Sequence, residues 1–161
     1  MRKHLLLPII ILLFTVLAQA QNPVPKELVE KKWGGLSEEN ANFTKSGKIQ
    51  LSHTLTMTLN YDNSVTGTGI TKMTLDGISY TNTTNISGRF YPSNWTIYIK
   101  DENLVWADKL PYDLRWCKGW GTLKFYSNAT HPGYYLLKGN ITDDCGGNSV
   151  IELTDFPNAY K

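Results

Sequence analysis

Aromatic side chains gather in one stretch of this sequence and are its strongest candidates for ligand binding. They fall within residues 95–120, on both sides of a long connection between two expected strands: Trp95, Tyr98, Trp106, Tyr112, Trp116 and Trp120. Large rings stack on sugars, line apolar pockets and anchor partner proteins, and they also cover the ends of small cores. We take all of them except Trp95, which shares a strand face with Ile97 and Ile99, as candidate ligand contacts.

His53 is a candidate of a different kind, because it interrupts a regular pattern. In residues 51–61 all odd positions except His53 are apolar or aromatic, while the even positions are Ser, Thr or Asn. This alternation predicts an antiparallel strand buried on one face, so the imidazole should point into the interior. A lone interior histidine is more often a hydrogen-bonded core residue than a ligand contact. If the interior holds a cavity, His53 becomes a polar contact among its walls.

Catalytic and metal-binding patterns are missing from the sequence. It contains no G-x-S-x-G, H-E-x-x-H, P-loop or G-x-G-x-x-G motif. Residues 143–148 carry carboxylates without the spacing of a calcium-binding EF-hand loop, so we expect no metal site and no cofactor. A carboxylate-dependent hydrolase is the weakest alternative, with a pair drawn from Asp101, Glu102, Asp108 and Asp113. We therefore expect a non-enzymatic protein.

Cys117 and Cys145 are the only cysteines and are predicted to form a disulfide. Neither belongs to a metal-binding or catalytic pattern, and two such cysteines in an exported chain most often pair. They would close a loop of about 28 residues, for which the chain-entropy model gives roughly 3 to 4 kcal/mol of stabilisation. A reactive thiol is the alternative, but no histidine lies near either cysteine in the sequence.

The elements that position these residues are predicted to be strands. Alternation marks segments at 51–61, 65–75, 78–91, 95–101, 114–126, 134–142 and 150–156, with an eighth strand if 36–48 contributes or 114–126 bends at Gly119. Asp76 and Gly77 are typical of a tight two-residue hairpin turn. Consecutive hairpins without helical periodicity form a meander, so we expect an all-β, antiparallel up-and-down barrel of seven to eight strands. A two-layer β-sandwich is the alternative.

Two further features favour a small soluble barrel. Several glycines inside the strand patterns fit the bends that a tightly curved sheet needs: Gly67, Gly69, Gly88, Gly119, Gly121 and Gly139. The positions opposite the apolar ones are mostly Thr, Asn, Lys and Ser, unlike the apolar outer face of an outer-membrane barrel.

Residues 1–20 have the pattern of a secretory signal peptide. Arg2 and Lys3 provide its positive start, an apolar stretch follows, and Ala18-Gln19-Ala20 is a typical cleavage site. We expect cleavage after Ala20, a periplasmic or secreted location, and no membrane insertion of the mature chain.

The mature chain is expected to be electrically neutral. Loss of Arg2 and Lys3 from the sixteen basic residues leaves fourteen, which match the fourteen acidic ones. Without a basic run or patch, nucleic-acid binding is not expected.

The region between the leader and the first strand shows no alternation. Residues 21–47 are therefore predicted to be an irregular N-terminal segment, with a helical turn within 26–32, and residues 48–161 to be the barrel domain. This segment suggests a rival function, a periplasmic or secreted protease inhibitor that inserts it into an enzyme cleft.

Six N-x-S/T sequons occur, at Asn42, Asn82, Asn85, Asn94, Asn128 and Asn140. They would accept glycans in a eukaryotic secretory protein. Because Asn and Thr are abundant here and the leader resembles the export signals of Bacteroidota, we interpret them as chance matches in a bacterial protein.

Short motifs spread over most of the mature chain carry a resemblance. They are Trp33-Gly34-x-Leu36, Val65-Thr66-Gly67-Thr68, Ile86-Ser87-Gly88, Trp116-Cys117, Gly121-Thr122-Leu123-Lys124, residues 137–141, Cys145-Gly146 and residues 150–153. Together they resemble a loosely defined family of small exported Bacteroidota proteins, which implies export but no established activity. The 65–98 region also looks like avidin-type and lipocalin-type barrels, although the lipocalin G-x-W opening is absent. No binding residue is carried over from either family.

These observations predict an exported, non-enzymatic binding protein. Its partner would be a small apolar molecule, a glycan or another protein, held at the open end of the barrel or on the outer face near residues 106–120. The candidate contacts are Tyr98, Trp106, Tyr112, Trp116, Trp120 and His53.

Overall fold

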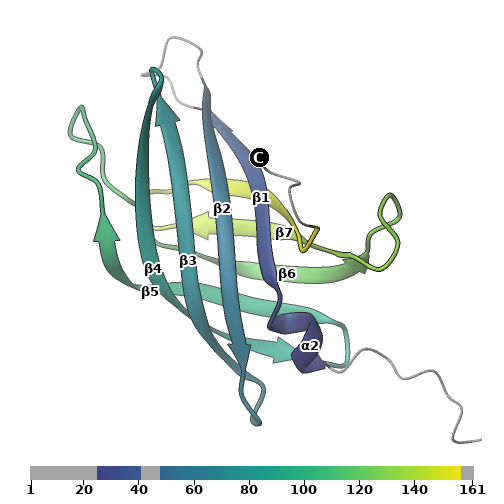
Figure 1. The fold of residues 1–161 in the computed structure, drawn as a ribbon. Coiled ribbons are helices and arrows are strands. Elements are labelled where there is room, and N and C mark those ends of the chain that lie inside the picture. The colour runs from purple at the N-terminus through teal and green to yellow at the C-terminus, as the bar shows by residue number, and fades with distance from the viewer. Residues whose placement is uncertain (1–24, 41–47, 157–161) are drawn as a thin grey trace, which may run out of the picture.

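The computed structural model describes residues 25–40 and 48–156, which form one short helix and a closed antiparallel barrel (Figure 1). The elements are α2 (Pro25–Val29), β1 (Lys32–Asn40), β2 (Lys48–Leu59), β3 (Ser64–Leu75), β4 (Ile78–Tyr91), β5 (Thr96–Ala107), β6 (Gly119–Ser127), β7 (Tyr135–Asp143) and β8 (Asn148–Thr154). Each strand pairs with the next in sequence, and β1 pairs with β8. The predicted barrel is therefore confirmed, and the sandwich alternative is wrong.

Two predicted segments differ from the structure in their boundaries. Strand β5 continues through Ala107, where a loop from residue 102 was expected, because irregularities in its pairing with β4 shift the alternation. The stretch 114–118 is not a strand; it belongs to the connection 108–118 between β5 and β6. The hairpin at Asp76-Gly77 is confirmed, and both residues have the positive φ that such a turn requires.

The N-terminal prediction also needs correction. The helical turn is present as α2, but residues 32–40 form β1 and pair with β2 over their whole length. The inward positions of β1 are Trp33, Gly35 and Ser37, of which only the first is apolar and large, so no alternation is visible. Because β1 is part of the barrel wall, residues 32–40 are not available for insertion into an enzyme cleft. The predicted signal peptide lies outside the described residues.

The apolar core is divided into two clusters along the barrel axis. The larger cluster lies at the α2 end, where Leu28 and Val29 of the helix pack among buried residues of the strands such as Trp33, Phe90 and Leu123. The smaller one lies at the other end, and its members are Ile49, Leu51, Met73, Leu75 and Leu110. Leu110 comes from the 108–118 connection, so this segment packs against that end of the core. In the described part of the chain, no helix is long and apolar enough to span a bilayer.

Substitution of Gly67 and of Gly69 should separate the effect of a close backbone neighbour from that of a close side-chain neighbour on the same strand. A Cβ at Gly67 would lie 2.1 Å from the Thr56 carbonyl oxygen, whereas one at Gly69 would lie 3.0 Å from the Thr84 hydroxyl oxygen, which is on a side chain. Because a backbone neighbour cannot rotate away, Gly67→Ala should lower the free energy of unfolding by about 2 kcal/mol more than Gly69→Ala. Urea unfolding of both variants measures the difference, and equal losses would contradict it.

Candidate functional site

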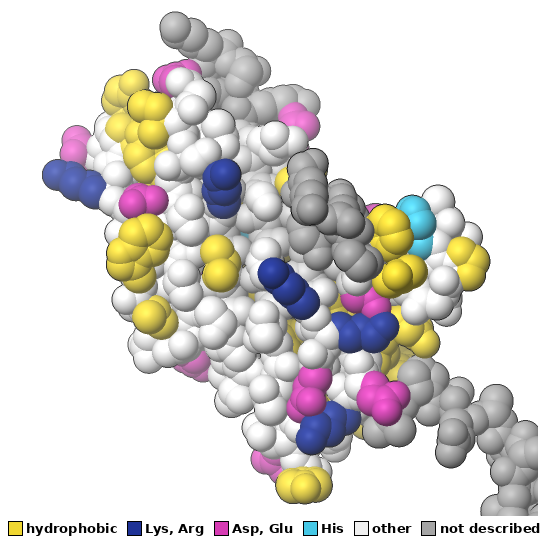
Figure 2. Space-filling view, viewed as in Figure 1, with side chains coloured by type: hydrophobic (Ala, Val, Ile, Leu, Met, Phe, Trp, Pro, Cys, Tyr) yellow, Lys and Arg dark blue, Asp and Glu magenta, His cyan; other side chains and the backbone are white. Residues whose placement is uncertain are grey.

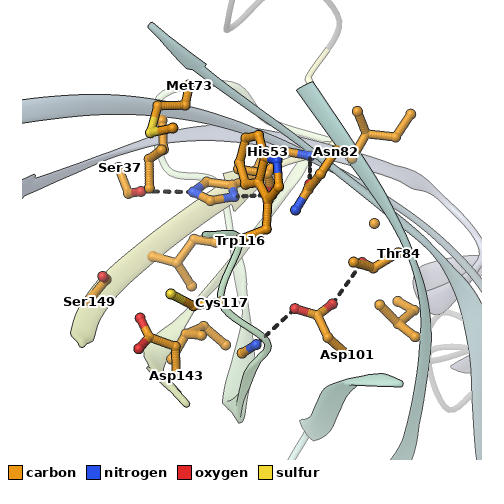
Figure 3. A pocket seen from close by; sticks show the side chains of 18 of the residues that line it. Ser37, His53, Met73, Asn82, Thr84, Asp101, Trp116, Cys117, Asp143 and Ser149 are labelled. Carbon is orange, nitrogen blue, oxygen red and sulfur yellow. Dashed lines mark hydrogen bonds between the residues drawn. The ribbon is translucent and has the colours of Figure 1, made fainter. Parts of the chain in front are cut away.

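A cavity of about 200 Å³ lies inside the barrel, between the two apolar clusters (Figure 3). Most of its wall is apolar, formed by side chains that include Leu51, Leu55, Met73, Ile86, Ile99 and Ile151. The exposed side chain of Arg115 also borders it, so the cavity reaches the surface beside the 108–118 connection. Apolar walls with a few polar groups are the usual character of a small-molecule site.

A row of polar side chains crosses the cavity wall over four adjacent strands. We call Ser37, His53, Thr71 and Asn82 the polar row; they come from β1, β2, β3 and β4 in turn. His53 pairs with Thr71 across β2 and β3, and Thr71 pairs with Asn82 across β3 and β4. This register places the side chains next to one another on the inner face.

Hydrogen bonds hold the polar row together. The Nε2 atom of His53 lies 2.8 Å from the Ser37 hydroxyl oxygen, and its Nδ1 atom lies 3.3 Å from the Thr71 hydroxyl oxygen (Figure 3). The backbone N–H of Thr71 donates to Oδ1 of Asn82 at 3.2 Å. The imidazole is therefore fixed in orientation on both sides.

The environment of His53 keeps the imidazole neutral. Burial in the barrel lowers its pKa from 6.5 to about 4, because the charged form loses its hydration. The two hydroxyl groups beside the ring carry no negative charge that would oppose this effect. At neutral pH the ring therefore offers one N–H donor and one acceptor nitrogen.

Asp101 forms a second polar point on the cavity wall. Its Oδ1 atom accepts a hydrogen bond from the Thr84 hydroxyl at 2.8 Å, and its Oδ2 atom accepts one from the backbone N–H of Gly119 at 2.9 Å (Figure 3). Thr84 is buried and Asp101 is half-buried. These two bonds fix the carboxylate where β5 and β6 begin to separate.

The 108–118 connection borders the cavity and is anchored at its C-terminal end. The Cys117–Cys145 disulfide, predicted from the sequence, joins it to the turn between β7 and β8. The backbone N–H of Lys118 donates to Oδ1 of Asp144 at 2.9 Å, which reinforces the same join. Trp116 packs against the smaller cluster, and its Nε1–H donates to the Asp108 carbonyl oxygen at 2.9 Å.

The sequence candidates do not all come together. His53 and Trp116 line the cavity, whereas the remaining four do not: Tyr98, Trp106, Tyr112 and Trp120. Trp120 points outward because its neighbours on β6, Gly119 and Gly121, occupy the inward positions. Trp106, Tyr112 and Trp120 have exposed side chains, of which Tyr112 is the most exposed at 72%. On the face shown in Figure 2, hydrophobic side chains form separate patches among polar atoms and charges of both signs.

Sequence reasoning missed most of the polar groups around the cavity, namely Ser37, Thr71, Asn82 and Thr84. It named Asp101 only as a possible member of a catalytic carboxylate pair. A signal for them was present in the strand phase. Asn82 and Thr84 are in the same strand phase as the apolar Ile86 and Phe90, and Asp101 is in the same phase as Ile97 and Ile99. A polar residue in the apolar phase is thus the mark of this site. The burial of Asn82, only 4% exposed, also makes its sequon unsuitable for a glycan.

The carboxylates proposed for hydrolysis have other partners. Asp108 accepts a hydrogen bond from the backbone N–H of Thr81 at 2.8 Å. Glu102 pairs with Lys100 at 3.0 Å, and a hydrogen bond from Ser87 and this pairing lower the pKa of its carboxyl. Asp113 is exposed on the 108–118 connection.

One group has the composition of a metal site, but its chemistry does not fit. Ligand atoms of Cys117, Asp143 and Cys145 lie within 4.8 Å of one another. Both sulfur atoms are bonded to each other, so neither is a thiolate that could bind a metal ion.

Comparisons with protein-family models, with curated proteins and with solved structures found no match to this chain. The resemblance to exported Bacteroidota proteins therefore stays a prediction.

The pKa of His53 predicts a pH dependence of stability. Because the folded-state pKa is below the unfolded value of 6.5, the unfolded chain binds more protons in the interval between the two. The free energy of unfolding should be at its full value above pH 6.5 and should fall as the pH drops toward 4. Protonation of His53 accounts for a loss of up to about 3 kcal/mol.

Urea unfolding from pH 4 to 7.5 tests this dependence. His53→Gln should reduce the loss of stability at low pH, whereas His131→Gln, in the β6–β7 loop, should leave it as in the wild type. If both variants lose stability as the wild type does, His53 is not the group responsible.

Proposed function

We propose that this protein is an exported, non-enzymatic binding protein that holds a small, mainly apolar molecule inside its barrel. The observation that carries this proposal is the cavity of about 200 Å³, with apolar walls and hydrogen-bonded polar groups on them. A cavity of roughly 150 Å³ accommodates benzene, so one ring with a few substituents matches the size.

A small molecule is favoured over a glycan or a protein partner. Of the predicted contacts, His53 and Trp116 meet at one place, and that place is the cavity. The outer aromatic residues supply no second convergent set, since Trp106 is on β5, Tyr112 on the connection and Trp120 on β6. Export is supported by the Cys117–Cys145 disulfide, because such bonds persist mainly in oxidising compartments.

A larger side chain inside the cavity should abolish binding, whereas the same replacement at an outward-facing position of the same strand should not. Ile151 lines the cavity, whereas its neighbour Val150 on β8 is 75% exposed. With saturating ethylbenzene as the probe, the wild type and Val150→Phe should unfold at a higher temperature than without it. Ile151→Phe should show no such increase, because the larger ring occupies the site. Thermal unfolding followed by circular dichroism measures this.

A second measurement covers the native ligand. A native mass spectrum of the protein secreted from a bacterial host would show any retained small molecule, the cleaved N-terminus and the intact disulfide. If neither ethylbenzene nor acetophenone changes the unfolding temperature of the wild type, and no mass is retained, the proposed function is wrong.

A further inference from the structure

Not every hydrogen-bond donor of the polar row has an acceptor within the row. Neutral His53 has one N–H and one bare nitrogen, and each ring nitrogen lies beside a hydroxyl group. The N–H donates to one hydroxyl oxygen, and the other hydroxyl donates to the bare nitrogen. In either tautomer, the hydroxyl that accepts from the ring keeps a proton with no acceptor among the described residues. One of Ser37 and Thr71 is therefore a free donor.

Asn82 adds an amide donor whose orientation is determined by its neighbour. A backbone N–H can only donate, so the atom of Asn82 that faces Thr71 N must be the carbonyl oxygen, and the amide nitrogen is directed elsewhere (Figure 3). That nitrogen has no hydrogen-bond partner among the described residues, although Asn82 is buried and lines the cavity. The nitrogen is open to the cavity and not sealed in the core, since the fully buried polar atom without a partner among the described residues is Trp33 Nε1. An acceptor placed in the cavity can therefore bond to it.

The acceptor that fits is uncharged. None of the side chains of the polar row carries a positive charge at neutral pH. The two cationic residues that border the cavity, Lys100 and Arg115, are exposed and bonded to Glu102 and to the Asp144 carbonyl oxygen. A ligand carboxylate buried against the row would lose its hydration without an ion pair, whereas a carbonyl oxygen would lose far less.

Asp101 requires the opposite chemistry. It has no ion-pair partner among the described residues, and its two hydrogen bonds use only part of the roughly four acceptor positions of a carboxylate. A ligand hydroxyl or amine can therefore donate to it. Hydrogen bonds to a charged group are the stronger ones, so this contact would also orient the ligand.

We propose that the ligand is a small ring compound with a neutral carbonyl acceptor against the polar row and a hydroxyl or amine donor against Asp101. This inference rests on the proposed function, because it assigns the chemistry of the same cavity.

A series of single-ring probes tests it on the wild-type protein at pH 7. Ethylbenzene has no polar group, acetophenone adds the carbonyl, 4-hydroxyacetophenone adds the donor, and 4-hydroxybenzoate replaces the carbonyl by a carboxylate. Dissociation constants from calorimetry should fall about 3- to 10-fold with the carbonyl and again by about 3-fold or more with the hydroxyl. The value for 4-hydroxybenzoate should be at least roughly 10-fold higher than for 4-hydroxyacetophenone.

Two pairs of variants assign the contacts. Asn82→Leu should remove the preference for acetophenone over ethylbenzene, whereas Asn85→Leu, at an exposed position of the same strand, should retain it. Asp101→Asn should reduce the gain from the ring hydroxyl, whereas Glu102→Gln, on the neighbouring position outside the cavity lining, should not.

The outcomes separate the two proposals. If no probe binds and the native mass spectrum shows no retained molecule, the cavity is not a binding site and the proposed function fails. If ethylbenzene binds as tightly as both ketones, or 4-hydroxybenzoate binds best, the function stands and the inferred ligand class is wrong. The probe series alone decides this if a variant does not fold.

Discussion

The barrel depends on a short seam between its first and last strands. Strands β1 and β8 pair through three residues on each side, with Gly35 opposite Leu153 at the centre. A Cβ at Gly35 would lie 2.1 Å from the Glu152 carbonyl oxygen, so the approach that closes the sheet requires glycine. An ion pair between Lys31 and Asp155 joins the chain beyond the end of the seam. Without closure, β1 and β8 would be open edges and the cavity would have no wall on that side.

The division of the core explains why a cavity forms where it does. Helix α2 supplies apolar side chains to one end, and the 108–118 connection supplies Leu110 to the other. Between these ends the polar row occupies inward positions of four adjacent strands and lines the cavity. The disulfide at Cys117 has two roles, because it anchors the connection and borders the cavity. The same segments thus stabilise the fold and shape the site.

The architecture was readable from the sequence to a large extent, and the site less so. Alternation in residues 51–61 and the Asp76-Gly77 turn identified the hairpins, and His53 was correctly placed on the inner face. Strand β1 was missed because its inward positions include Gly35 and Ser37, which are not apolar markers. The outer aromatic residues are large enough to bind a ligand, yet Trp120 lies between two inward-facing glycines of β6 and points away from the interior. Their grouping in sequence did not predict grouping in space, since strand phase decides which face a side chain reaches.

The polar row is more informative about function than the aromatic residues are, because it occupies inward positions that the core would otherwise fill. Apolar side chains at the same inward positions would extend the core between the two clusters and avoid a histidine whose charged form is disfavoured there. Asn82 and one hydroxyl of the polar row keep donors that face the cavity without an acceptor among the described residues. A departure from local stability that is repeated on adjacent strands and directed into one cavity is the pattern expected of a site that a ligand completes. The chemistry of these groups therefore constrains what can bind, even where the shape of the cavity alone would admit many molecules.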